Sequence, residues 1–582
     1  MSTNELHMLP MVTHVNLSEK TVEARAYQLE ALNEILTNSM MLVLPTAAGK
    51  TAVAWMATAE KLTKSDGWIL MIAPTVALVN QHLQGMIKMI ESKGRPPISI
   101  TGQNPKKTRL KMWQSSRIII ATPQVARNDI KNGILDISNC SLMILDEAHH
   151  STGNHAMAEI GKMYNSNSDY GLILAMTASP GHTISKVAEI CKRLSINRIH
   201  LRSSEDYMLT GYLSNLEIQE IKVIVPVEIH NMANPLKIWQ QGIVDQERRK
   251  GRYVMPGEIN HIGLTTAMER AQAAITRGDK TAFISVSQIA IAMRLHHLIN
   301  HLMCQGTAAS GEFLNRMKMN LDNKSIRMFM RDLRIQNLIS NIQQRDEIHS
   351  KIGAVRRLVR ERLRRNPNSR IIIFANYRDT IKVLEVALND LKGARAIKFV
   401  GQSKRIGEEG MNPKKQIEKL EEFKNGNSNI LLSTSVGEEG LDIPSADLVI
   451  FYEPVSSETR TIQRRGRTGR HREGEVIVLV AEGTRDEGAS IAALRREMNM
   501  KKAVQRVKRT LPNLNNIDRA KLDNFSIIDS DVVMTPEEFI DREKATRQPK
   551  VSKFDQTKLN SKPNERKIIN FKSKEQRGLN DY

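Results

Sequence analysis

The sequence predicts an α/β fold with two parallel-sheet domains, a helical insertion domain between them and a flexible basic C-terminal tail. Three observations predict this architecture. Short continuous apolar runs alternate with helical stretches from about residue 40 to 215, and the same alternation returns from about 369 to 485. Between them, from about 230 to 350, the apolar residues follow helical periodicity. Apolar strands separated by helices are typical of a parallel sheet that is covered on both faces.

The first parallel-sheet domain is expected over residues 1–215. Ligands of such sheets bind at the carboxyl ends of the strands. Polar residues directly follow several of the expected strands, so the sequence predicts a binding site along that edge. The strands are expected in MMLVLP (40–45), GWILMIAP (67–74), SRIIIATP (116–123), SLMILDEAHH (141–150) and GLILAMTASP (171–180).

The rest of the chain is expected to divide into three parts. Residues 356–510 form the second parallel-sheet domain, with strands in SRIIIFAN, ARAIKFVG, SNILLSTS, ADLVIFYEP and EVIVLVAEG. Residues 511–582 lose the periodicity and are rich in Lys and Arg, which indicates a disordered basic tail. Residues 216–355 form the helical domain, because one helix face there carries Ile291, Leu295, Leu298 and Leu302.

The composition narrows the class of protein. The 582 residues carry 85 Lys and Arg against 63 Asp and Glu, a formal charge of +22, and 40% of them are hydrophobic. A globular protein with this positive surplus usually binds a polyanion, with nucleic acid as the first candidate and an ordinary basic enzyme as the alternative. Three cysteines without CxxC spacing exclude a disulfide framework and indicate a reducing, intracellular location. The sequence shows neither a signal peptide nor an apolar run near 18 residues, so we expect no membrane contact.

The segment PTAAGKT (45–51) lies between an apolar strand and a helix that opens with TAVAWMA. Small residues there let backbone N–H groups close around phosphate oxygens, and the helix N-terminus adds partial positive charge. Lys50 would reach the β- and γ-phosphates, and the Thr51 hydroxyl would hold Mg²⁺. A chance strand–turn–helix is the alternative. The predicted nucleotide-binding residues are Thr46, Ala47, Ala48, Gly49, Lys50 and Thr51.

Two further motifs complete a predicted site for nucleoside triphosphate hydrolysis. In LDEAHH, Asp146 emerges from a strand and can bind Mg²⁺, while Glu147 can orient and deprotonate the attacking water. In QRRGRTGR, Arg467 and Arg470 are placed to stabilise charge on the transferring phosphoryl group from the opposite domain. The alternatives are a solvated acidic turn and a basic surface loop.

Together with these motifs, several blocks of sequence resemble superfamily 2 helicases of the DEAH-box type, above all the archaeal Hef helicases and their Fanconi anaemia M relatives. The resemblance covers about residues 20 to 510. It implies two RecA-like domains that sandwich ATP and a helical domain that grips branched DNA. The blocks are APTVALVNQH (73–82), ATPQVARNDI (121–130), MTASPG (176–181), FVGQS (399–403), STSVGEEGLDIP (433–444), VIFYEPV (449–455), QRRGRTGRH (463–471) and GTRDE (483–487).

The resemblance, and not the spacing, assigns roles to further residues. Gln28, in ARAYQ, matches the adenine-reading glutamine of the family, and an exposed helix residue is the alternative. The other roles are coupling of hydrolysis to domain motion by His149, Thr177 and Ser179, approach to the ribose by Gly440 and Asp442, and completion of the pocket by Gln463, Arg467 and Arg470.

The resemblance also implies contacts with a nucleic-acid strand. Backbone and hydroxyl groups of this kind grip phosphates without reading bases. Binding is therefore expected to be largely independent of sequence and strongly weakened by salt. The implied residues are Pro74, Thr75 and Gln81, then Thr122, Pro123 and Gln124, then Thr434 and Ser435.

The family implies an ATP-dependent motor that uses ATP and Mg²⁺ and moves 3′→5′ on forks and Holliday junctions in DNA repair and recombination. Its expected location is the cytoplasm of an archaeal-type cell, associated with the nucleoid. A double-stranded RNA translocase of the Dicer and innate-sensor type remains an alternative. So does an ATP-gated scaffold that binds junctions and recruits a separate nuclease without unwinding DNA.

Protein partners are indicated by weaker features. Hef proteins often continue into an XPF-type nuclease with an ERKxxxD signature, and the tail has ERK at 565–567 but Phe571 in place of the Asp. We therefore expect a nuclease that is encoded separately. A sliding clamp is a further expected partner by family analogy. Gln556 and Leu559 have the spacing of a clamp-binding box, without its aromatic pair.

One cluster has the spacing of a metal site. His297, His301 and Cys304 fall at i, i+4 and i+7 of one expected helix. Zinc sites of structural type need four ligands, and no fourth stands out. We therefore expect no metal there, and histidines that are exposed or hydrogen-bonded instead.

Overall fold

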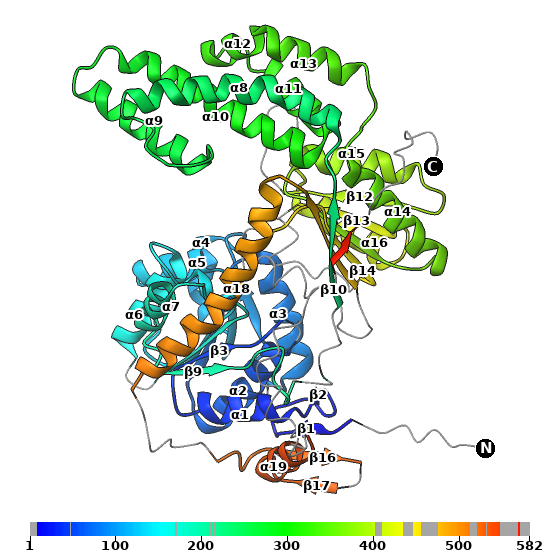
Figure 1. Ribbon diagram of the computed structural model, residues 1–582. Helices are drawn as coiled ribbons and strands as arrows, with labels where there is room; N and C mark the ends of the chain where they lie inside the picture. Colours follow the sequence, from blue (N-terminus) through cyan, green and yellow to red (C-terminus); the bar gives the residue numbers. More distant parts are fainter. Residues whose placement is uncertain are drawn as a thin grey trace, which may run out of the picture.

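The computed structural model describes residues 9–46, 48–92, 94–168, 171–209, 212, 217–401, 410–434, 446–455, 475–512, 521–530, 532–547 and 568–570. These residues form two parallel sheets, a helical domain and a small antiparallel sheet (Figure 1). The two helix-covered parallel sheets confirm the predicted fold class.

The first parallel sheet has the described strand order β5-β6-β4-β7-β8-β3-β9, and all neighbours pair in parallel. Helices cover both faces, so the central strands are almost fully buried. The strands are β3 (Met40–Val43), β4 (Trp68–Ile72), β5 (Ile98–Ile100), β6 (Ile118–Ala121), β7 (Cys140–Leu145), β8 (Leu172–Thr177) and β9 (Arg198–Leu201). The helices are α1 (Ala26–Ile35), α2 (Lys50–Lys64), α3 (Val76–Met89), α4 (Lys106–Trp113), α5 (Pro123–Lys131), η1 (Ala148–His150), α6 (Ala156–Asn167) and α7 (Ile184–Arg193).

The second parallel sheet has the described order β12-β13-β11-β14-β15-β10-β18. β10 (Glu217–Val223) pairs in parallel with β15, so the second domain begins before the helical domain and not after it. The expected start of the helical domain at residue 216 is therefore wrong, since its first helix begins at Val227, and the expected boundary at 355 falls inside α14. The other elements are β11 (Ile371–Phe374), β12 (Ala396–Phe399), β13 (Ile430–Ser433), β14 (Leu448–Phe451), β15 (Glu475–Ala481), β18 (Ile568–Asn570), α14 (Ser350–Arg365), α15 (Arg378–Asn389) and α16 (Pro413–Lys424).

The helical domain lies above the second sheet in Figure 1. Its central helix α10 packs against α8, α9 and α11 and buries the predicted face of Ile291, Leu295, Leu298 and Leu302. Among the described helices, α10 alone is long and apolar enough to cross a membrane; part of its apolar surface lies in the core, while Phe283 and Ile284 near its start are exposed. The helices are α8 (Val227–Arg249), α9 (His261–Thr276), α10 (Ala282–Gln305), α11 (Thr307–Lys318), α12 (Lys324–Arg331) and α13 (Leu333–Gln343).

A long helix, α18 (Arg485–Thr510), connects the two parallel-sheet domains, as the orange ribbon in Figure 1 shows. Near its start, the Ser490 hydroxyl donates to Glu220 of β10 at 2.7 Å. Further along, Met500, Ala503, Val504 and Val507 join the core of the first domain beside α7.

Residues 521–547 also return to the first domain. β16 (Ser526–Asp529) pairs antiparallel with β1 (Met11–Thr13) in a sheet of order β17-β16-β1-β2, which includes β17 (Val532–Met534) and β2 (Val22–Glu23). α19 (Pro536–Arg547) packs on α1 below the first sheet (Figure 1). The expectation of a disordered tail is therefore wrong for the described residues of 521–547. Their apolar side chains find partners only at the opposite end of the chain, which local periodicity does not reveal.

Candidate active site

The predicted phosphate loop, meaning the segment PTAAGKT (45–51), follows β3 and continues into the first turn of α2, as the motif predicts. Gly49 has a left-handed backbone (φ +75°), which favours glycine, and a Cβ there would lie 2.3 Å from Nε2 of Gln28 and would displace that side chain. The Lys50 ammonium donates to the carbonyl oxygens of Leu44 (3.2 Å) and Pro45 (3.4 Å), so it lies over the loop. Thr51 follows in the first turn of α2.

Two side chains of helix α1 donate hydrogen bonds to backbone carbonyls of this loop. The Tyr27 hydroxyl donates to the Ala48 carbonyl at 2.8 Å, and Nε2 of Gln28 donates to the carbonyls of Ala48 (3.0 Å) and Gly49 (3.3 Å). Gln28 is buried, which excludes the alternative of an exposed helix residue. Only the amide nitrogen of Gln28 can donate to these two carbonyl oxygens, so the other amide atom, Oε1, faces away from them. This Oε1 has no hydrogen-bond partner among the described residues. A buried acceptor of this kind fits the amino group of an adenine.

Asp146 directly follows β7 and is almost fully buried. Its Oδ2 lies 2.7 Å from Nε2 of His82 in α3. Burial alone would raise the pKa of the Asp146 carboxyl, but His82 and the nearby charge of Lys50 hold this pKa below its usual value. A carboxylate that stays charged at the end of a strand and a threonine hydroxyl, here that of Thr51 in the first turn of α2, are oxygen ligands of the kind that Mg²⁺ accepts.

Glu147 has a left-handed backbone (φ 49°, ψ 48°), which is uncommon for a residue with a side chain. The turn into η1 holds it there, because the His150 amide donates to its carbonyl at 3.1 Å. Oε2 of Glu147 lies 3.3 Å from Nδ1 of His149, and that nitrogen lies 3.4 Å from Oγ1 of Thr177. Oγ1 of Thr177 also accepts from the Ser179 amide at 3.1 Å. The structure thus brings the predicted coupling residues together around the predicted base.

The strand order places these groups in sequence along one edge. β8, which ends at Thr177, lies between β7 and β3, and therefore between Asp146 and the phosphate loop. On the other side of β7 lie the ends of β4 and β6, where the residues expected to contact nucleic acid are found. The phosphate loop and the residues of this domain expected to bind nucleic acid thus lie on opposite sides of β7.

The expected nucleic-acid residues of the first domain lie at two helix N-termini. Thr75 caps α3 by accepting from the Leu78 amide at 3.2 Å, and Pro74 precedes it. Thr122 precedes the first turn of α5, which begins at Pro123, but its side chain makes no capping hydrogen bond. N-termini of helices favour bound phosphates. Gln81 and Gln124 are exposed, and Thr434, at the end of β13 in the second domain, is buried.

Several predicted residues lie outside the described ranges and stay predictions. They are Ala47 of the phosphate loop, Ser435, Gly440 and Asp442, and Gln463, Arg467 and Arg470 of the arginine-rich motif.

The sequence reasoning missed His82. It lies with Val79 and Met86 in the buried stripe of α3, at the spacing of a helix face. A histidine within an apolar stripe needs a buried polar partner, and that was the available signal. Tyr27 was missed for a similar reason, since its hydroxyl partner lies on another element.

The rings of His297 and His301 pack against the rings of Phe313 in α11 and Tyr377, and Cys304, in the same helix as the two histidines, is buried. The His301 ring lies 4.3 Å from the Tyr377 ring and 5.2 Å from the Phe313 ring, measured between centroids. Burial lowers the pKa of His297 to about 4 and that of His301 to about 2, so both imidazoles are neutral. Across the described ranges, no group of three His, Cys, Asp or Glu side chains is arranged to hold a metal ion.

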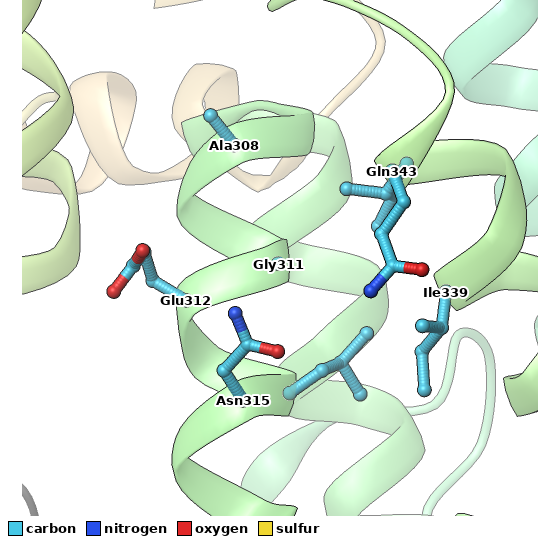
Figure 2. Close-up of a pocket in the computed structure, with 8 residues that line it drawn as sticks. Ala308, Gly311, Glu312, Asn315, Ile339 and Gln343 are labelled. Atoms are coloured by element: carbon cyan, nitrogen blue, oxygen red, sulfur yellow. The ribbon is translucent and has the colours of Figure 1, made fainter.

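A small pocket lies apart from these residues, between α11 and α13 of the helical domain (Figure 2). Ile339 and Gln343 of α13 face Gly311 and Asn315 of α11 across it. None of the predicted site residues lines it.

The chain is similar in sequence and fold to known proteins. The DEAD/DEAH box helicase family matches residues 25–187, and the helicase conserved C-terminal domain matches residues 350–472. The crystal structure of the Pyrococcus furiosus Hef helicase domain has a TM-score of 0.63 and 33% identity with this chain, covering 81% of it and 98% of the Hef domain.

Two curated relatives are longer proteins. A Methanocaldococcus jannaschii protein, provisionally named an ATP-dependent RNA helicase, is 36% identical over 85% of this chain and 62% of its own length. The ATP-dependent DNA helicase MPH1 of Coccidioides immitis is 30% identical over 80% of this chain and 45% of its own length. The chain thus spans about half the length of these relatives. The match covers nearly the whole of the Hef helicase domain, and the two helicase family models match this chain one after the other. The chain therefore belongs to the superfamily 2 DEAD/DEAH-box helicases of the Hef type.

Proposed function

We propose that this protein is an ATP-driven DNA motor that acts on forked or branched DNA during repair and recombination and moves 3′→5′. One contact carries the proposal. His82 lies on α3, whose N-terminus belongs to the expected strand-binding edge, and it bonds directly to Asp146 of the nucleotide site. A shift of α3 on binding a nucleic-acid strand would therefore move the Asp146 carboxylate.

The hydrolytic chemistry follows from the residues at the ends of β3, β7 and β8. Bound Mg²⁺ would offset the charge of the phosphates, with Thr51 and Asp146 as its ligands. The Lys50 ammonium leaves the Leu44 and Pro45 carbonyls and donates to the phosphates. Glu147, held by its turn and by His149, accepts the proton of the attacking water. From the second domain, Arg467 and Arg470 would face the transferring phosphoryl group, with Gln463, Gly440 and Asp442 beside the nucleotide.

Residues of both domains would contact the nucleic-acid strand. Thr75 and Thr122 of the first domain, and Thr434 with Ser435 of the second, would contact backbone phosphates. Since such contacts carry no base information, affinity would not depend on sequence. Alternating grip by two domains that close and reopen around ATP would produce movement along the strand.

The choice of DNA over RNA rests on the relatives. MPH1 is named a DNA helicase, whereas the Methanocaldococcus jannaschii relative carries an RNA helicase name. Double-stranded RNA is therefore the second candidate substrate. A sliding clamp and a separately encoded nuclease are the proposed protein partners, and the proposed location is the cytoplasm near the nucleoid.

The test is the ATPase rate with forked DNA, a four-way junction, single-stranded DNA and double-stranded RNA at matched salt. We expect the highest stimulation with the branched DNAs, and none for the Lys50→Ala variant with any of them. Highest stimulation with double-stranded RNA would overturn the assignment of DNA. Strand displacement on the fork, measured in parallel, separates unwinding from an ATP-gated scaffold, which would hydrolyse ATP without releasing a strand.

A further inference from the structure

The C-terminal segment, meaning the described residues of 521–547, is built into the first domain beside the phosphate loop. Leu522, Phe525 and Phe539 are almost fully buried in the core that also contains Ala48. The Asn524 amide donates to the Glu60 carboxylate at 3.2 Å. The segment is thus a fixed part of the domain that carries the nucleotide site.

One end of α19 holds a tyrosine of the connection between the two parallel-sheet domains. Tyr212 lies between β9, which ends at Leu201, and β10, which begins at Glu217. Its hydroxyl donates to Oε2 of Glu543 at 3.2 Å, and the Arg547 guanidinium lies 4.2 Å from the centre of its ring. Cation–π contacts of this kind favour a fixed ring orientation.

Tyr212 in turn contacts helix α1. Its ring meets the Tyr27 ring edge-on at 5.9 Å between centroids, and the Arg25 guanidinium lies 4.9 Å from the ring centre. The hydroxyl of Tyr27 donates to the Ala48 carbonyl. A continuous series of contacts therefore runs from Arg547 through Tyr212 and Tyr27 to the phosphate loop.

The last contact has a direct consequence for phosphate binding. In a trans peptide the carbonyl and the N–H of one peptide unit point in opposite directions. When Tyr27, together with Gln28, draws the Ala48 carbonyl towards α1, the N–H of Gly49 must point away from α1. That direction is the one required of a backbone donor to a phosphate.

We propose that the C-terminal segment positions the phosphate loop for ATP, with Glu543 and Arg547 holding Tyr212, and Tyr212 holding the Tyr27 side chain that sets the Ala48–Gly49 peptide. The inference rests on the proposed function in one respect, namely that this loop binds ATP. These side chains touch no reacting atom, so they are positioning residues. Their loss weakens the binding of ATP and leaves the chemical step intact.

The experiment uses the full chain with Tyr212→Ala, Tyr212→Phe and Arg547→Ala. Arg542→Ala is the matched control, because it removes the same charge from α19 while Arg542 pairs with Asp529 and not with Tyr212. We measure the Kd of a fluorescent ATP analogue, and KM and kcat for ATP with forked DNA. For Tyr212→Ala and Arg547→Ala we expect Kd and KM to rise about three- to tenfold, the effect of one lost contact of this kind, with kcat nearly unchanged. Tyr212→Phe keeps the ring contacts, so its rise should be smaller.

A double variant tests the path. If Arg547 acts through Tyr27, then Arg547→Ala with Tyr27→Phe should raise Kd by less than the product of the single effects. Unchanged Kd and KM in Tyr212→Ala and Arg547→Ala would overturn the inference, and so would an equal rise in Arg542→Ala. Thermal unfolding of each variant without nucleotide identifies any that fail to fold, and Tyr212→Phe then provides the decisive comparison.

Failure of the proposed function has a different signature. A wild-type chain that binds the analogue without DNA-stimulated turnover would contradict the motor, while the binding titrations would still decide the role of α19. A wild-type chain that neither binds nor hydrolyses ATP would overturn both.

Discussion

Glu147 combines an unusual backbone with a histidine contact. A non-glycine residue with positive φ costs of order 1 kcal/mol, so its surroundings must hold it in place. Here the His150 amide and the ring of His149 do so, and His149 leads on to Thr177 at the end of β8. The carboxylate that would activate water is thus aimed by its own turn and linked to the neighbouring strand.

We expect Glu147→Gln to lower the ATPase rate by about 100- to 10,000-fold, since an amide cannot accept the proton of water. Nucleotide and DNA affinities should change little, because the substitution keeps shape and size. Single-turnover kinetics measure the rate, and titrations with nucleotide and with DNA measure the two affinities. Glu421→Gln, at an exposed position of α16, is the control. Normal turnover by Glu147→Gln would show that another group is the base.

Glu60 joins three parts of the first domain. Its carboxylate lies 3.0 Å from His14 and 2.6 Å from Lys64, and it accepts from Asn524 of the C-terminal segment. Burial alone would raise the pKa of Glu60, but these three partners lower it from 4.5 to about 2. Because the folded pKa is depressed, the stabilisation is complete above pH 4.5 and disappears as the pH falls to about 2.

The Glu60→Gln variant should therefore unfold more easily than the parent at neutral pH, by about 3 kcal/mol. The difference should shrink below pH 4.5 as the parent loses the same charge. Denaturant unfolding at neutral and acid pH measures both values. Glu91→Gln, at an exposed position, should show no such difference. An equal loss for Glu60→Gln at every pH would point to packing instead of charge.

Helix α18 belongs to two domains. Its first turns bond to the second domain, where Lys351 is buried in an ion pair with Asp486, and its last turns bury Val504 and Val507 in the first. A helix of 26 residues spans about 39 Å at 1.5 Å per residue, enough to cross both domains. It therefore joins the two domains through contacts at both of its ends.

Replacing Val504 by Asp should destabilise the attachment of α18 to the first domain by about 3 kcal/mol, because an unpaired charge would enter an apolar core. Gln505→Asp places the same charge at the exposed neighbouring position and should change stability by less than about 0.5 kcal/mol. Thermal unfolding compares the two. If both variants unfolded like the parent, the burial of α18 against the first domain would be contradicted.

The whole molecule carries a formal charge of +22, and its expected strand-binding groups lie along the carboxyl edges of two parallel sheets. Contacts with phosphates release bound counterions, which makes affinity fall with salt. Contacts with bases would give a weaker dependence on salt and a stronger dependence on sequence.

We expect the logarithm of the DNA association constant to fall linearly with the logarithm of salt concentration, by about 0.7 to 0.9 for each phosphate contact. Two unrelated sequences of equal length and shape should give the same line. Fluorescence anisotropy with both DNAs across a salt series measures it. A flat line, or lines that differ between the sequences, would exclude a grip on the backbone alone.

Short-range features of this protein could be predicted from the chain order. The phosphate loop, the Asp146–Glu147 pair and the apolar strands are contiguous, so spacing and residue type identify them. Their neighbours could not be predicted in this way. His82 meets Asp146 across 64 positions, and Thr13 meets Ser526 across 513.

The physical reason is that a sheet does not follow the chain. In the order β5-β6-β4-β7-β8-β3-β9, the end of β8 lies between Asp146, which follows β7, and the phosphate loop, which follows β3. Both of these precede β8 in the sequence. Likewise, β10 joins the sheet of β15, more than 250 positions later, and Phe525 and Phe539 enter a core begun by β1 and α1. Residue type and spacing specify which chemistry the chain can perform. The path of the backbone specifies which side chains hold that chemistry in place, because burial and hydrogen bonding act between neighbours in space.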